Sequence, residues 1–249
     1  MYTIFDDAGN RLLDIEHGLS GLEGEFASIR DNKISRQLDL TLDEKHYIFA
    51  FVSAMHNRTV TMKEQISKQW GKVLELGKRM KQQHDNATPE QRKAMESVGS
   101  LNNGGASFSM DEVKKFHNEP MQTLMFPRIH AEFIHYTKMH MSILNTNDEV
   151  GFITSDNPCV WFDPDAYKRP PIYRSVGLGY ENVEVTLPIS PKQLILISHK
   201  PLPLYVSVAM RNVDSVNRAT RFHADKYYIV NRNFKKDYWF KVIEPPSIN

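Results

Sequence analysis

The strongest constraint on the fold is a change of sequence pattern near residue 148. Before this point, apolar residues recur at spacings of three and four, which is the period of an amphipathic α-helix. After it, short runs rich in Val, Ile and Tyr alternate with Pro-containing turns, which is typical of strands. The pattern predicts an α+β fold, with a mostly helical half over residues 1–147 packed on a mainly antiparallel sheet over 148–249. We expect residues 1–249 to form a single domain.

Local signals locate several element boundaries. Residues 41–44 and 109–112 have the spacing of a capping box, and Thr88 followed by Pro89 is a typical helix start. Pro127 is expected to break or kink the helix that contains it. The glycines and asparagines of 99–107 predict a mobile loop outside the core. In chain order, the predicted elements of the first half are a hairpin over 2–13, helices over 14–30, 41–57 and 58–83, helices starting near 88 and 109, and a helix over 120–144.

In the second half, apolar runs of strand length are separated by turn residues. Residues 163–179 are rich in Pro, Gly, Tyr and charge, so we expect a long loop over one face, and long ordered loops are often functional. A helix is expected between the last two strands. The predicted strands are 150–154, 182–188, 194–198, 204–210 and 227–231, and the predicted helix is 213–222.

The balance of charge and the cysteine content exclude several classes of protein. A net charge of +1 argues against a strongly polyanion-coated or membrane-bound protein, although a local basic groove is compatible with it. A single cysteine, Cys159, excludes an internal disulfide framework and fits a reducing compartment. No apolar run has the length of a membrane span, and no signal peptide is evident. These features predict a cytoplasmic protein without a membrane partner.

The segment 152–160, FITSDNPCV, contains the first candidate site. An apolar run ends abruptly at a carboxylate and an amide, Asp156 and Asn157, and strand ends often carry chemistry. A carboxylate beside an amide suits a hard cation, so Asp156 is a candidate ligand for a divalent ion such as Mg²⁺. The alternative is a tight turn, which Asp, Asn and Pro also form through side-chain hydrogen bonds.

Basic residues near helix ends supply the other candidates. His56 follows an apolar helical stretch and is a candidate general acid or base, and Arg58 next to it suits a phosphate. Arg221 belongs to a basic and aromatic C-terminal stretch of the kind that binds single-stranded nucleic acid. The alternatives are capping of helix C-termini by basic side chains and an ordinary solvated helix face.

Three further patterns leave alternatives open. Arg128 and His135 are about two helical turns apart, a spacing similar to the Arg-x6-His arrangement of the HEPN ribonucleases, although that motif is frequent by chance. Glu132 with His135, and Asp43 with His46, resemble halves of a di-iron site, which needs further Glu ligands. Cys159, between Pro and Val, is expected to be a buried and unreactive thiol.

The sequence also resembles a bacterial family of domains of unknown function. The similarity is carried by IEHGLSGLEGE at 15–25, FAFVSAMHNRT at 49–59, FITSDNP at 152–158, LPISPKQLILIS at 187–198 and the segment 216–221. Members of that family typically begin with His-Tyr-Val-Pro, which is missing here. The resemblance implies no particular activity.

Two functions are therefore expected. The first is a nucleic-acid-directed hydrolase of the phosphodiesterase or nuclease type, with Asp156, Asn157 and His56 in catalysis and Arg58 and Arg221 on phosphate. The second is a non-catalytic binding or regulatory module in a multi-protein assembly, which the missing histidine of the family's opening favours. Nucleic acid and a protein are the corresponding partners.

Overall fold

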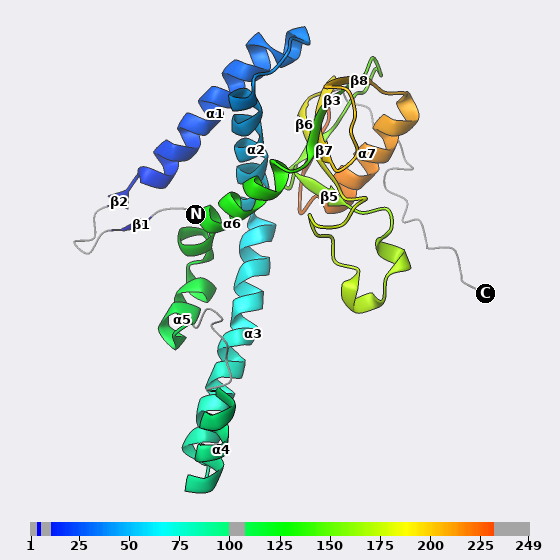
Figure 1. Ribbon diagram of the computed structural model, residues 1–249. Helices are drawn as coiled ribbons and strands as arrows, with labels where there is room; N and C mark the ends of the chain where they lie inside the picture. The colour runs from blue at the N-terminus through cyan, green and yellow to red at the C-terminus, as the bar shows by residue number, and fades with distance from the viewer. Residues whose placement is uncertain (1–3, 6–10, 100–107, 232–249) are drawn as a thin grey trace.

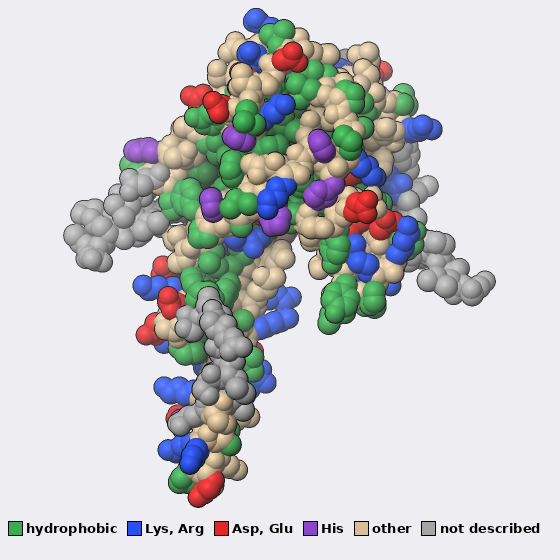
Figure 2. Space-filling model, in the orientation of Figure 1, with side chains coloured by type: hydrophobic (Ala, Val, Ile, Leu, Met, Phe, Trp, Pro, Cys, Tyr) green, Lys and Arg blue, Asp and Glu red, His purple; other side chains and the backbone are tan. Residues whose placement is uncertain are grey.

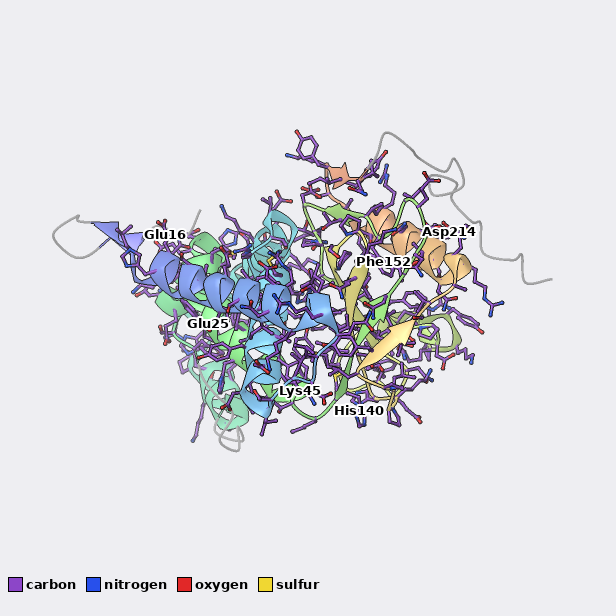
Figure 3. All side chains as sticks on the ribbon, turned by 90° about the horizontal axis from the view of Figure 1, so that it is seen from above. Glu16, Glu25, Lys45, His140, Phe152 and Asp214 are labelled. Carbon is purple, nitrogen blue, oxygen red and sulfur yellow. The ribbon has the colours of Figure 1, made fainter. Side chains whose placement is uncertain are left out.

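The computed structural model describes residues 4–5, 11–99 and 108–231, and the loop predicted at 99–107 falls almost entirely outside them. Helices occupy the first half and a sheet the second, so the predicted α+β class is confirmed. Figure 1 shows the helices of the first half to one side of the sheet, with one long helix extending away from both. Figure 3 shows the same division from above, with Glu16 and Glu25 on the helical side and Phe152 and Asp214 on the other.

The N-terminal elements follow the local signals closely. Strands β1 (Ile4–Phe5) and β2 (Arg11–Leu12) pair antiparallel and lead into helix α1 (Asp14–Asn32), followed by a short 3-10 turn, η1 (Ile34–Arg36). Helix α2 (Leu42–Asn57) begins at the predicted capping box, in which the Glu44 N–H donates to Thr41 Oγ1 at 3.2 Å and the Thr41 N–H donates to Glu44 Oε2 at 2.7 Å. Two backbone donors at the helix start are satisfied in this way.

Three helices form a projecting arm. Helix α3 (Val60–Asp85) starts at Thr59, whose hydroxyl accepts the Met62 N–H, and it is the longest helix in the described chain. Helix α4 (Pro89–Gly99) follows at its far end, and α5 (Met110–Asn118) begins at the second predicted capping box. Helix α5 packs along α3, where Ser67 Oγ donates to the His117 carbonyl at 2.8 Å.

The predicted helix over 120–144 is wrong in its last third. Helix α6 (Pro120–Tyr136) ends before strand β3 (His140–Asn145). Met141, Ile143 and Leu144 are buried because β3 pairs along its whole length with β7. Non-local strand pairing therefore overrides the local helical pattern. Pro127 does not end α6, which continues through it with the proline on the exposed side.

The main sheet has the strand order β5-β6-β7-β3-β8. Strands β5 (Val160–Phe162), β6 (Glu184–Ser190), β7 (Gln193–Ser198) and β3 pair antiparallel in turn, and β8 (Tyr205–Ser207) adds to β3 in parallel. The mainly antiparallel character is confirmed, whereas β5 was not predicted. Between β5 and β6 lies the expected long loop, with the short turns η2 (Ala166–Lys168) and η3 (Pro171–Tyr173).

Side chains alternate between the two faces of the sheet, as the period of a strand requires. Ile143, Ile195 and Val185 join a core with Phe26, Ile48 and other residues of the helical half, so this core spans both halves of the chain. On the opposite face, Leu144, Leu194 and Leu196 pack against Val213 of helix α7 (Met210–His223). The sheet is thus sandwiched between the N-terminal helices and α7.

The strand predicted at 150–154 is mostly irregular chain. Only Thr154–Ser155 is a strand (β4), which pairs with β9 (Tyr228–Ile229). Gly151 has a φ of +73°, and the backbone N–H of Ile153 donates to the Asn217 side chain at 3.0 Å instead of to a neighbouring strand. The apolar residues Val150, Phe152 and Ile153 are buried as expected. The N–H groups of Val150 and Ile153 donate to the side chains of Asp148 and Asn217, and that of Phe152 donates to the Pro191 carbonyl. Within the described ranges, no helix is sufficiently long and apolar to cross a membrane.

Candidate active site

The candidate active site lies where the last turn of α2 meets α6 and β5. His56 and Asn57 end α2, and Thr59 starts α3 one residue after Arg58. The Thr59 hydroxyl donates to the His56 carbonyl at 3.3 Å and accepts the Met62 N–H at 3.2 Å. This junction fixes the backbone under His56, so the imidazole has a defined direction.

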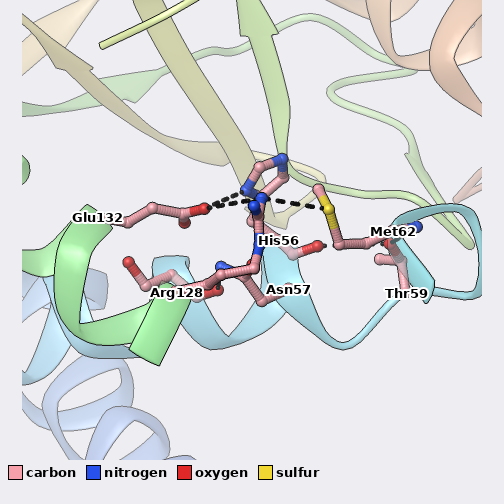
Figure 4. Close-up of polar contacts among 7 residues, drawn as sticks. His56, Asn57, Thr59, Met62, Arg128 and Glu132 are labelled. Atoms are coloured by element: carbon pink, nitrogen blue, oxygen red, sulfur yellow. Dashed lines mark hydrogen bonds and ion pairs between the residues drawn. The ribbon is translucent and has the colours of Figure 1, made fainter. Parts of the chain in front are cut away.

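His56 is paired with a buried carboxylate (Figure 4). Its Nδ1 lies 2.9 Å from Oε1 of Glu132 on α6, and the two side chains are 12% and 7% exposed. The second carboxylate oxygen, Oε2, is buried and has no hydrogen-bond partner in the described part of the chain. Because buried polar atoms are nearly always satisfied, an orphaned carboxylate oxygen beside a histidine marks a site for a water molecule or a ligand.

Arg128 places a positive charge next to this pair. It lies one turn before Glu132 on α6, and its Nη2 is 3.9 Å from Glu132 Oε1. Its Nε donates to Oδ1 of Asn57 at 2.8 Å, and the Asn57 amide donates in turn to the Ser53 carbonyl at 3.0 Å. Asn57 is fully buried, so it holds the guanidinium on the side that faces the protein interior. The Arg128 side chain nevertheless remains 37% exposed. The guanidinium therefore has both a fixed position and access to solvent.

Aromatic residues form the other wall of the site. The Trp161 ring of β5 stacks on the His56 ring, with centroids 4.3 Å apart and planes inclined by 26°. Burial, with the negative charge of Glu132 nearby, raises the pKa of the Tyr136 hydroxyl well above its ordinary value. Burial also raises the pKa of the Cys159 thiol. Tyr136 and Cys159 therefore stay protonated at neutral pH, and Cys159 is buried as expected for an unreactive thiol.

Asp156 and Asn157 serve as an anchor in the structure. The Asp156 carboxylate accepts three backbone N–H groups, from Asp225 at 2.9 Å, Lys226 at 2.7 Å and Tyr227 at 3.0 Å. The Asn157 amide donates to the His223 carbonyl at 3.0 Å. These contacts tie the turn after β4 to the segment that links α7 to β9. They match the alternative considered for the motif, a turn built on side-chain hydrogen bonds.

The structure does not unite the predicted site residues through shared contacts. His56 contacts α6 and β5, and Arg58 forms an ion pair with Glu23 of α1. Arg221 lies with its guanidinium carbon 5.3 Å from the centroid of the Tyr228 ring, beside the anchor of Asp156. Arg58 and Arg221 therefore contact different elements. The catalytic and metal roles of Asp156 and Asn157 remain predictions, and their hydrogen bonds favour anchoring instead.

Metal binding has no cluster to support it in the described chain. No three His, Cys, Asp or Glu side chains among these residues come together in a way that could hold an ion. Glu132 and His135 are three residues apart on α6, but Glu132 is directed to His56. The proposed Mg²⁺ at Asp156 thus has a single carboxylate, already engaged by three amides.

The sequence pattern indicates His56 but does not connect it to its partners. Glu132 is 76 positions away in the chain, so nothing local connects it to His56. Arg128 and Glu132 were each noted within α6, though for other chemistry. Trp161 gave no signal, because β5 itself was not predicted.

Comparison with known proteins identifies the family. No curated protein and no solved structure matches this chain. The pattern of the family described as "Protein of unknown function (DUF4238)" matches residues 1–234. That range covers the helical half, the sheet and all residues of the candidate active site. The chain therefore belongs to the DUF4238 family.

Proposed function

We propose that this protein is a nucleic-acid-directed hydrolase of the phosphodiesterase type, in which His56 acts as the general base and general acid. The observation that carries the proposal is the buried His56–Glu132 pair, 2.9 Å apart, with the Arg128 guanidinium beside it. A histidine oriented by a carboxylate is a recurrent general acid–base device. An arginine with a fixed, partly exposed guanidinium suits a phosphate group.

Glu132 would act as the positioning residue. Because it engages Nδ1, it leaves Nε2 as the nitrogen that meets a ligand, and its negative charge stabilises the imidazolium that forms when His56 takes a proton. In hydrolysis, His56 would accept the proton of the attacking water as the new oxygen–phosphorus bond forms. It would return a proton to the leaving oxygen as the old bond breaks.

Arg128 would neutralise the phosphate in this reaction. Two phosphate oxygens can accept from one guanidinium, and the positive charge stabilises the negative charge that accumulates in the transition state. Asn57 holds Nε and the Met62 sulfur accepts from Nη2, so the guanidinium is already fixed and has little freedom to lose on binding. Arg58 and Arg221 are proposed as more distant phosphate contacts.

A non-catalytic binding module is the second candidate. The exposed fraction of His56 is only 12%, and the pair joins α2 to α6, so a purely structural role would also explain its burial. In that case, loss of His56 would lower stability without affecting any reaction.

An oligonucleotide cleavage assay tests the proposal. Fluorescein-labelled single- and double-stranded RNA and DNA are incubated with wild type, His56→Gln, Glu132→Gln and Arg128→Lys, with Mg²⁺ and with EDTA. His130→Gln is the matched control. His130 is an exposed histidine on α6, the helix of Arg128 and Glu132, and it lies on a side away from Arg128. We expect cleavage by wild type and control, and losses of about 10²-fold or more in His56→Gln.

Two outcomes would contradict the proposal. The first is the absence of cleavage of every substrate by wild-type protein. The second is full activity in His56→Gln when thermal unfolding shows the variant to be folded. Binding without cleavage would support the second candidate.

A further inference from the structure

Helix α3 exposes an apolar stripe far from the candidate active site. Val73, Leu76 and Met80 are 45%, 52% and 60% exposed. Their spacings of three and four residues put them on one face of the helix. Figure 1 shows that this part of α3 extends beyond the rest of the fold. An apolar stripe on a solvent-exposed helix indicates an interaction surface.

The packing of α5 does not cover this stripe. Helix α5 lies on the adjoining face of α3, where His117 is against Gly71 and Met110 is against Gly77. Trp70 of α3 packs with Phe108 and Phe116 on that side. The glycines allow this close approach of the two helices. The stripe is therefore left beside the α3–α5 contact.

A groove between the far end of α3 and α4 lies on the neighbouring face of α3, beside Arg79, and none of the three stripe residues lines it. This groove has a volume of about 580 Å³. Met95 of α4, on its wall, is 44% exposed. Arg79 is the one charged residue in the lining, and it lies next to Met80. The lining consists of Arg79, Gln82, Gln83, Asn86, Ala87, Gln91, Ala94 and Met95.

The charge around the stripe is positive. Helix α3 carries six Lys or Arg residues against three Asp or Glu residues. Lys72 and Arg79 directly precede Val73 and Met80 and are seven residues apart, so they follow one edge of the stripe. Glu75 lies between them on this edge, and Lys68, one turn before Lys72, keeps the edge net positive. Figure 2 shows Lys and Arg side chains along the projecting arm.

We propose that the apolar stripe of Val73, Leu76 and Met80, with Lys72 and Arg79 along its edge, binds an acidic amphipathic helix of a partner protein. An amphipathic helix packs its own apolar side against such a stripe, at the same spacings of three, four and seven residues. Acidic side chains along its edge would meet Lys72 and Arg79. A second copy of this chain would set basic edges against each other, and a nucleic acid would leave the apolar stripe unused.

Fluorescence anisotropy with a synthetic peptide tests the proposal. The probe is a labelled helical peptide with Leu at the a and d positions of a heptad repeat and Glu on both flanks. A second peptide carries Lys in place of Glu. We expect the acidic peptide to bind wild-type protein and the basic one to bind at least about tenfold more weakly.

Variants of exposed residues locate the binding. Leu76→Gln with Met80→Gln, and Lys72→Glu with Arg79→Glu, should each weaken binding of the acidic peptide by about tenfold or more. Lys78→Glu is the matched control, since Lys78 lies on the far side of α3 from Leu76 and Met80, and it should change binding by less than about twofold.

Three results would overturn the proposal. One is equal binding of the acidic and basic peptides, and another is binding that the Leu76 and Met80 substitutions leave unchanged. The third is self-association, seen by sedimentation as a dimer that those same substitutions dissolve.

Discussion

Replacing Asp156 by Asn separates an anchoring role from a catalytic one. The substitution keeps the shape of the side chain but removes the negative charge that accepts the N–H groups of Asp225, Lys226 and Tyr227. The Asn amide would also direct its own N–H₂ group toward these donors. The connection between α7 and β9 should loosen, while the contacts of His56 are not touched.

The size of the effect follows from these three bonds. A hydrogen bond to a charged group contributes about 1.5–3 kcal/mol when shielded from water. Asp156 is exposed, so water can replace part of each bond, and we expect a total loss of about 2 kcal/mol. For a chain of this length that corresponds to a fall in Tm of about 4–8 °C. Asp225→Asn is the matched control, because its own side chain takes no part in the anchor.

The loss should depend on pH in a defined direction. Burial alone would raise the pKa of Asp156, but the amide hydrogen bonds of Lys226, Tyr227 and Asp225 together hold it below its ordinary value. Such a group stabilises the fold above its unfolded pKa of about 3.9, and this contribution is lost as the pH falls through the lower folded pKa. The gap in Tm between wild type and Asp156→Asn should be complete near neutral pH and shrink below about pH 4.

Calorimetry over a pH series measures both quantities. Equal Tm values for wild type and Asp156→Asn at neutral pH would refute the anchoring argument, and so would a gap that stays constant into the acidic range. Loss of the proposed nuclease activity with an unchanged Tm would restore the catalytic role predicted for Asp156.

Three further substitutions or reactions probe the fold. Asn217→Ala should lower the free energy of unfolding by about 2–4 kcal/mol in urea titrations, because this fully buried amide satisfies the Gly151 carbonyl and the Ile153 N–H; a loss below about 1 kcal/mol would contradict this. Gly151→Ala should cost at least about 2–3 kcal/mol, since φ is +73° and the added Cβ would lie 1.9 Å from the Pro191 carbonyl oxygen; a variant of wild-type stability would show that the loop rearranges freely. Cys159 should react with a thiol reagent only after unfolding, because burial keeps its thiol protonated, whereas prompt labelling of native protein would show that the site opens.

Local signals predicted most of the helical half. Both capping boxes form as expected, because the bonds of Thr41 with Glu44 and of Ser109 with Glu112 involve only neighbouring residues. Strand β3 was missed because its conformation depends on pairing with β7, some fifty residues later in the chain. The buried segment around Gly151 has the apolar pattern of a strand, but its hydrogen bonds go to Asn217, 64 and 66 positions away.

The site shows the same limit. His56 was singled out by its place at the end of a helix, and that place is correct. Its proposed chemistry involves Glu132, which only the crossing of α2 and α6 brings near. Conversely, Asp156 had the sequence context of a functional strand end, but its amide partners lie 69 to 71 positions away. A motif shows which side chains are present, and long-range packing decides what they contact.

A double-mutant cycle on kcat/KM tests the central claim most directly. His56→Gln, Glu132→Gln and the double variant are compared with wild type on an oligonucleotide that the wild-type protein cleaves, with thermal unfolding measured in parallel. If Glu132 acts through His56, the double variant should be no slower than His56→Gln alone, because residues that work as a unit have non-additive effects. Losses that multiply, or a His56→Gln variant that is folded and fully active, would contradict the account.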